Sequence, residues 1–93
     1  MPVVQLNLTF QLPGCGSLKE KRRRLRRLVD IFGRDPQIAV TESDYHDQWQ
    51  QAQWSFVVVG GDRRIIESRC SAIENFCHQL DAYITDSQRR ELA

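Results

Sequence analysis

The sequence predicts a single α+β domain with the element order strand–helix–strand–strand–helix–strand. Three observations lead to this fold class: the N-terminal residues alternate between apolar and polar side chains, two later stretches have helical periodicity, and strand-like residues follow each of these stretches. With 93 residues, of which 41% are hydrophobic, the chain has enough apolar surface for one core. We therefore expect one domain over residues 1–93.

The first expected strand and the first expected helix are joined by a tight turn. In PVVQLNLTFQL every second side chain is apolar, which predicts a strand with one buried face, and PGCGS has the composition of a turn. Ser17 is placed to cap the helix N-terminus, and Glu20 would complete a capping box. We expect a helix from about Leu18 to Phe32, ended by Gly33. Its apolar arc consists of Leu18, Leu25, Leu28, Val29 and Phe32.

The second half of the chain repeats this arrangement after a hairpin. QIAV predicts a strand with Ile38 and Val40 inward, DYHDQ predicts a turn, and WQQAQWSFVVVGG predicts a strand whose inward side chains are Ala52, Trp54, Phe56 and Val58. Asp62 is expected to cap the second helix, whose apolar stripe is Ile65, Ile66, Cys70, Ile73, Phe76, Cys77 and Leu80. AYITDSQRREL alternates poorly and is expected to form an edge strand.

This order of elements is that of the ferredoxin-like split βαβ arrangement, with both helices on one face of a four-stranded antiparallel sheet. Connections through helices are right-handed, and from this rule we expect the first and third strands to be parallel neighbours in the middle of the sheet.

The composition favours a soluble cytoplasmic protein. No apolar stretch is long enough to span a membrane, and the N-terminus lacks the charged and apolar regions of a signal peptide. Three cysteines, an odd number, argue against a disulfide framework. Cys70 and Cys77 lie on the apolar stripe of the second expected helix and are expected in the core.

The first expected helix carries the main charged feature. Residues 17–34 contain eight Lys and Arg against two acids, whereas residues 35–62 contain five acids and no Lys or Arg. Positive and negative charges are therefore concentrated in different segments, although the net charge of the chain is only +1. A row of cations with few acidic partners one turn away indicates contacts with phosphates, although a solvated helix face has the same composition. The candidate nucleic-acid-binding residues are Lys19, Lys21, Arg22, Arg23, Arg26 and Arg27.

Lys21 differs from the other cations because it falls near the centre of the apolar arc, where a hydrophobic side chain is expected. Either its long side chain reaches out to solvent at the rim, or it forms an ion pair with an acid at the end of the sheet. Glu42 and Asp44 are the candidate partners.

Other groups of residues indicate sites less strongly. The GCGS turn before a helix resembles a generic anion site, but it lacks the G-x-x-x-x-G-K-[ST] pattern, and its Cys15 has no neighbouring base. Glu42, Asp44, His46 and Asp47 include metal-ligating types, but their spacing fits no ligand motif and Asp is common in turns. We therefore predict no catalytic residue, no metal and no cofactor, and we do not expect an enzyme.

The outward face of the expected sheet is polar. RNA-recognition domains of this fold stack bases on aromatic side chains of the two central strands, but here the outward residues are Gln5, Asn7, Thr9, Gln11, Gln53, Ser55 and Val57. Base stacking on this face is therefore not expected. A flat polar face suits solvent or a partner such as a second copy of the chain, and Trp49 beside the hairpin is a candidate interface residue.

Three segments resemble the YlxP-like family of small bacterial proteins: PGCGSLKEKRRRL, VTESDYHDQWQQA and GGDRR. SLKEKR is the most specific part, and the resemblance covers nearly the whole chain. It implies the ferredoxin-like fold and a genomic setting among translation-initiation and ribosome-maturation factors, but no activity and no catalytic residues.

From the residues and the resemblance together, we expect a small RNA-associated protein that contacts ribosomal RNA or a ribosomal particle through its basic helix. The alternative is a homodimeric interaction module whose basic helix meets an acidic protein partner. A third hypothesis is a regulator that binds a small anion at the GCGS turn. No membrane partner is expected.

Overall fold

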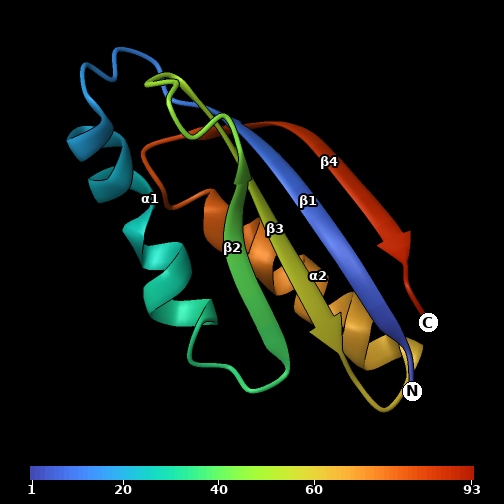
Figure 1. Cartoon of the computed structure of the whole chain (residues 1–93). Coiled ribbons are helices and arrows are strands. Elements are labelled where there is room, and N and C mark those ends of the chain that lie inside the picture. Colours follow the sequence, from blue (N-terminus) through green and yellow to red (C-terminus); the bar gives the residue numbers. More distant parts are fainter.

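The computed structural model describes residues 1–93 and confirms the expected fold class (Figure 1). The elements are β1 (Val3–Gln11), α1 (Leu18–Phe32), β2 (Ile38–Asp44), β3 (Gln51–Val59), α2 (Arg63–Cys77) and β4 (Tyr83–Glu91). The strands form one sheet in the order β2-β3-β1-β4, and each neighbouring pair is antiparallel. The two chain ends lie close together at one end of the sheet, where Val3 N donates a hydrogen bond to Ala93 O.

The expectation that the first and third strands run parallel is wrong. β1 and β3 are neighbours in the middle of the sheet, but they pair antiparallel, with Leu6 opposite Phe56. The right-handed connection through α1 relates β1 to β2, and it leaves room for one strand between them. β3 returns from β2 through the hairpin, so it runs against both strands and fills that space.

The core lies between the sheet and both helices, on the face that the alternation in β1 predicts. Leu6, Leu8 and Phe10 of β1 are fully buried, as are Phe56 and Val58 of β3. Residues from both helices belong to the same cluster, which places α1 and α2 on one face of the sheet. The helix members are Leu25, Leu28 and Phe32 of α1 and Ile66, Cys70, Ile73 and Cys77 of α2.

The helix N-termini form largely as their capping residues predict. Ser17 Oγ accepts a hydrogen bond from Glu20 N at 3.0 Å, and Asp62 Oδ1 accepts one from Ile65 N at 3.0 Å. The capping box is half formed, because the Glu20 carboxylate accepts a hydrogen bond from Arg24 instead of reaching back to the cap. Both helices therefore begin where an oxygen-bearing side chain can satisfy a free amide.

Two residues assigned to the apolar stripes are exposed. Val29 of α1 is 46% exposed, and Ile65 of α2 is 39% exposed. α1 lies over the β2 side of the sheet, and β2 is an edge strand, so no further strand covers the side of the helix that carries Val29. Helical periodicity therefore predicted the centre of each buried stripe correctly, but it included residues at the border that are exposed.

Cys70 and Cys77 lie in the core, as predicted, and their burial gives the fold a pH dependence. Burial raises the pKa of the Cys77 thiol from 9.0 to about 12, and Glu74 adds to the shift. In the unfolded chain this thiol ionises near its ordinary pKa, so its contribution is present below about pH 9 and is lost as the pH rises towards 12.

We therefore expect the free energy of unfolding to fall at alkaline pH, by up to about 1.4 kcal/mol per pH unit for this one thiol. Urea unfolding between about pH 7 and about pH 11 measures the slope. The Cys77→Ala variant should be less stable throughout and should lose stability less steeply above pH 9. Equal slopes for the two proteins would contradict this assignment.

Candidate functional site

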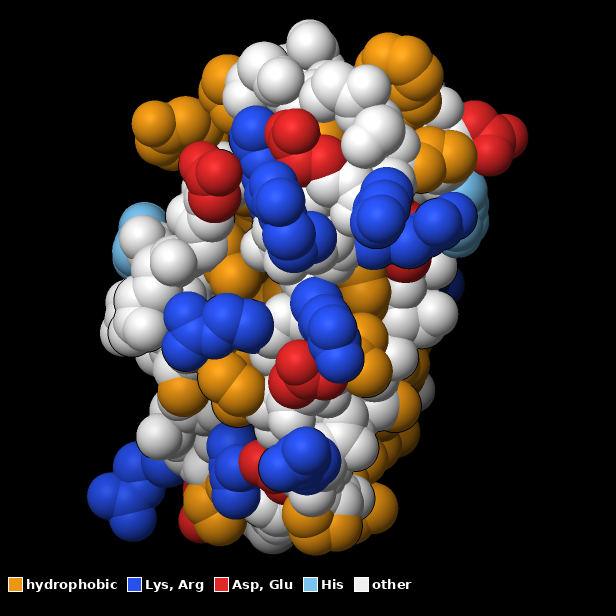
Figure 2. All heavy atoms as spheres, turned by 90° about the vertical axis from the view of Figure 1, so that its left-hand side faces the viewer, with side chains coloured by type: hydrophobic (Ala, Val, Ile, Leu, Met, Phe, Trp, Pro, Cys, Tyr) orange, Lys and Arg blue, Asp and Glu red, His pale blue; other side chains and the backbone are white.

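The exposed face of α1 brings together four of the six predicted nucleic-acid-binding residues. Lys19, Arg22, Arg23 and Arg26 are all exposed, and their helical spacing sets them on adjacent turns. Figure 2, which views the molecule from the α1 side of Figure 1, shows Lys and Arg side chains along the length of this face with fewer acidic ones between them. We call Lys19, Arg22, Arg23 and Arg26 the basic face.

Three members of the basic face have no acidic partner. Lys19, Arg22 and Arg23 form no ion pair within 4.0 Å, whereas Arg26 Nε lies 3.6 Å from Asp30 Oδ2. The Arg26–Asp30 pair is exposed on both sides, so it contributes little to stability and exchanges readily for another anion. The basic face therefore offers three free cations and one weakly held one.

Glu20 lies in the first turn of α1, and its ion pair is with Arg24 rather than with a member of the basic face. Its carboxylate accepts a hydrogen bond from Arg24 Nη2 at 2.6 Å. Desolvation raises the pKa of Glu20, but the contact with Cys15, the charge and hydrogen bond of Arg24 and the charge of Arg23 outweigh it, and the pKa is lowered overall. Arg24 also approaches Asp81 at 3.3 Å and donates to Pro13 O at 2.9 Å, so it ties α1 to the preceding turn and to the connection between α2 and β4.

Arg27 has a structural contact that the sequence pattern did not indicate. Its guanidinium carbon lies 4.8 Å from the centre of the Phe76 ring on α2. Such a contact is worth about 0.5–1 kcal/mol at an exposed site. Arg27 therefore links the two helices, and substitutions here change packing as well as charge.

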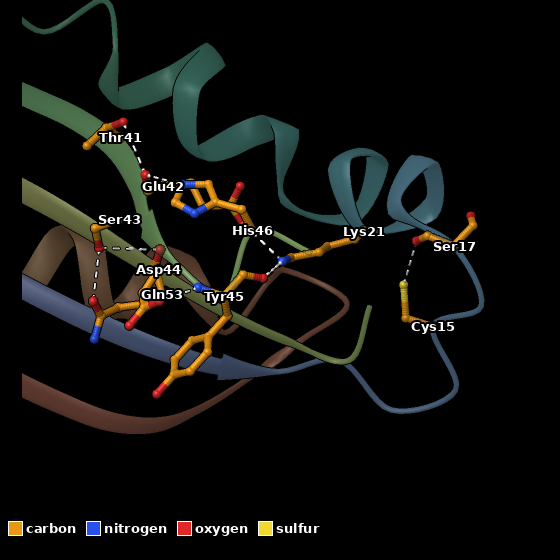
Figure 3. A network of polar contacts seen from close by, with 10 residues as sticks. All are labelled: Cys15, Ser17, Lys21, Thr41, Glu42, Ser43, Asp44, Tyr45, His46 and Gln53. Carbon is orange, nitrogen blue, oxygen red and sulfur yellow. Dashed lines mark hydrogen bonds and ion pairs between the residues drawn. The ribbon is translucent and has the colours of Figure 1, made fainter. Parts of the chain in front are cut away.

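Lys21 is wrongly placed among the nucleic-acid-binding residues, because its side chain is only 3% exposed. Figure 3 shows it extending from α1 to the hairpin between β2 and β3. There Nζ lies 3.1 Å from Glu42 Oε2 and donates a hydrogen bond to Tyr45 O at 2.7 Å. The side chain is thus part of the link between α1 and the hairpin rather than of the surface.

Asp44, the other candidate partner of Lys21, makes a different contact. Asp44 Oδ1 accepts a hydrogen bond from Tyr45 N at 2.7 Å, and Asp44 forms no ion pair. Tyr45 has a left-handed backbone with φ 61°, which is unfavourable for a bulky residue. Asp44 on its amide and Lys21 on its carbonyl therefore hold the turn in this conformation.

The remaining candidates from the sequence are not assembled into sites. His46 Nε2 lies 3.1 Å from Glu42 O, and no group of three or more His, Cys, Asp and Glu side chains is placed to hold a metal ion. Cys15 in the GCGS turn is buried, and its Sγ donates to Ser17 O at 3.4 Å. Gly14 has φ 70°, so the turn itself requires a glycine there.

Beside the basic face lies a groove of about 810 Å³ that also contains an aromatic side chain, Trp54 of β3. Trp54 was expected in the core, and it does pack against the core, but it remains partly exposed and lines the groove together with Val29. A smaller cavity of about 150 Å³ shares Arg22, Glu42 and Trp54 with the groove. The sequence did not predict this groove, because Trp54 points to the same side of its strand as the core residues Ala52, Phe56 and Val58.

The open face of the sheet is polar, as expected, and its side chains are bonded to one another. Asn7 Oδ1 accepts hydrogen bonds from Gln5 Nε2 at 2.9 Å and from Ser55 Oγ at 2.6 Å. Ser43 Oγ lies 2.7 Å from Ser55 Oγ and donates to Gln53 Oε1 at 3.1 Å. This network crosses β1, β3 and β2. Trp49, the candidate interface residue, lies in the loop that joins β2 to β3 and is 51% exposed.

None of the helices is both long enough and apolar enough to cross a bilayer.

The chain is similar in fold to a crystal structure of a protein provisionally described as a chlorite dismutase. The TM-score is 0.54 and the sequence identity is 14%, so the likeness concerns the fold alone. The match covers 98% of this chain and 44% of the other, so this chain spans less than half the length of that protein. No curated protein matches the sequence.

One family model matches the sequence over residues 3–89, and its description is "Protein of unknown function (DUF503)". The matched range includes β1, both helices and nearly all of β4. The chain therefore belongs to the DUF503 family, the YlxP-like family that its turn, hairpin and second-helix motifs resemble.

Proposed function

We propose that this protein binds the phosphate backbone of structured RNA through the basic face of α1. One observation carries the proposal: Lys19, Arg22 and Arg23 are exposed on a single helix without an acidic partner. Ribosomal RNA or a ribosomal particle is the partner we expect, on the genomic setting that the family resemblance implies.

Electrostatics favours a polyanion as the ligand. Like charges one turn apart on a helix destabilise it, and a row of phosphates would offset this repulsion along the whole face. Each phosphate that a cation neutralises releases counterions, so binding weakens with salt. Contacts of this kind fix position and orientation but do not read base sequence, so we expect binding that depends on RNA shape.

The alternative of a homodimer that forms through the sheet face remains a prediction, and that face supplies no observation in its favour. Its side chains already satisfy one another in the network around Asn7 and Ser55. The alternative of an acidic protein partner uses the same basic face, so the experiment must separate it from RNA.

We expect a structured ribosomal RNA fragment to bind with a steep salt dependence, measured by fluorescence anisotropy from about 50 to about 200 mM salt. In the Arg22→Glu/Arg23→Glu variant the affinity should fall, and the slope of log K against log salt should become shallower by about 2. Arg27 is left unchanged because of its contact with Phe76.

The matched control reverses two cations elsewhere. Arg64 and Arg90 are exposed and unpaired, so Arg64→Glu/Arg90→Glu changes the net charge by the same amount away from α1. An equal loss of affinity in both variants would mean that binding depends on the net charge of the protein and not on the basic face, and it would overturn the proposal. Displacement of the RNA by an oligoglutamate peptide of equal charge, at equal concentration, would favour the acidic protein partner instead.

A further inference from the structure

The groove beside α1 combines positive charge with an aromatic side chain. Trp54 projects from β3 on the helix side of the sheet, opposite Glu42 of β2. Because β2 is an edge strand, the sheet does not extend past Glu42 to cover this corner. Trp54 is therefore partly exposed at the base of the groove, and Val29 adds an apolar wall.

The free charge in the groove is positive. Each of its three carboxylates already has a cationic partner: Glu20 pairs with Arg24, Asp30 with Arg26, and Glu42 with Lys21. Lys19, Arg22 and Arg23 line the same groove without a partner. An anionic occupant is thus favoured over a neutral or cationic one.

The indole of Trp54 also has an unsatisfied polar atom. Its Nε1 is shielded from solvent and has no hydrogen-bond partner. Buried donors in folded proteins are nearly always paired, so an unpaired one needs an explanation. Because Nε1 is covered, an acceptor can reach it only after the indole or its neighbours shift, and the contact expected in the groove is with the exposed part of the ring.

We propose that the groove binds a single unpaired nucleotide of the RNA, with its base against Trp54 and its phosphate at Arg22 and Arg26. The proposal rests on the proposed function, since it names the part of the RNA that this same face takes up. A groove of about 810 Å³ lies within the range of small-molecule sites. Planar bases stack on aromatic side chains regardless of their identity, so this contact adds affinity without sequence readout.

The consequence is a preference for RNA with a bulged or single-stranded residue. In a continuous duplex the bases are stacked on one another and cannot reach Trp54 without being displaced. The basic face alone would not distinguish the two, because it contacts only phosphates. The aromatic side chain therefore converts a general phosphate contact into recognition of an unpaired position.

The experiment uses the full chain with Trp49→Phe, so that Trp54 is the only tryptophan and its fluorescence reports on the groove. The probes are an oligoadenylate octamer and an octamer of abasic ribose phosphates, which has the same phosphates and no bases. We expect the oligoadenylate to quench Trp54 emission and the abasic octamer to leave it unchanged. Trp49 alone, in a Trp54→Leu variant, should respond to neither.

Affinities give a second readout that survives a loss of stability. Trp54→Leu, which keeps an apolar side chain at the core, should weaken oligoadenylate binding about 5-fold to 150-fold and leave binding of the abasic octamer unchanged. Equal weakening for both octamers would mean that the indole contributes nothing specific to the base, and would overturn the stacking contact.

The two proposals fail in different ways. If both octamers bind equally well, lose affinity in Arg22→Glu/Arg23→Glu and leave Trp54 emission unchanged, the phosphate-binding function stands and the nucleotide site is overturned. If neither the octamers nor the structured RNA bind, both proposals are overturned.

Discussion

Replacing Glu42 with Gln is expected to lower the free energy of unfolding by about 3 kcal/mol. Lys21 Nζ is almost fully buried, and its only other partner is Tyr45 O. Gln keeps a hydrogen-bond acceptor but removes the charge, which leaves a buried ammonium group without a counter-charge. The expected loss lies at the lower end of the range for a broken buried ion pair, because Glu42 itself is 25% exposed to water.

Urea unfolding of Glu42→Gln measures this loss, and Asp44→Asn is the matched control. Asn at position 44 can still accept the hydrogen bond from Tyr45 N, so that variant should stay within about 0.5 kcal/mol of the parent. The double variant Lys21→Met/Glu42→Gln should recover most of the stability, since it removes both charges. A loss below about 1 kcal/mol in Glu42→Gln, or equal losses in Glu42→Gln and Asp44→Asn, would contradict the assignment.

Replacing Phe32 with Ala is expected to lower the free energy of unfolding by about 3–5 kcal/mol. Phe32 stands at the end of α1, where its ring meets Phe56 of β3 edge-on at 5.9 Å and Phe76 of α2 edge-on at 5.5 Å. It thus connects three elements of the fold, and each aromatic pair adds about 0.5–1.5 kcal/mol beyond the buried area.

The control for this prediction is Phe32→Leu, which retains most of the volume and should cost less than about 1.5 kcal/mol, apart from the lost ring contacts. Thermal or urea unfolding distinguishes the two variants. If Phe32→Ala cost no more than Phe32→Leu, the ring would not be filling the space between sheet and helices. The guanidinium of Arg27 lies over the ring of Phe76. The Phe32→Ala variant therefore also removes a side chain that supports the ring in this contact.

Much of the basic surface could be recognised from the sequence, but the roles of its members could not. Lys19, Arg22, Arg23 and Arg26 are exposed because their angular positions on α1 lie away from the apolar arc. Lys21 and Arg27 belong to the same basic stretch of α1, yet the side chain of Lys21 reaches the hairpin and that of Arg27 lies over the ring of Phe76 on α2. A helical projection gives directions on one helix, and these two contacts depend on what other elements place beside it.

The sequence by itself determined the features that depend on neighbouring residues. Alternation in β1, the caps Ser17 and Asp62, and the periodicity of α1 and α2 follow from steric and hydrogen-bonding preferences that act within a few residues. These preferences were sufficient for the element order and the fold class.

Only the tertiary structure decided how distant segments meet. The antiparallel pairing of β1 with β3, the choice of Glu42 over Asp44 by Lys21, and the exposure of Trp54 in a groove all join residues that are far apart in the chain. Such contacts arise from the packing of whole elements, because the position of a side chain in space depends on the strand order and on which strand lies at the edge. The chemistry proposed for this protein depends on that edge, since β2 leaves Trp54 open beside the cations of α1.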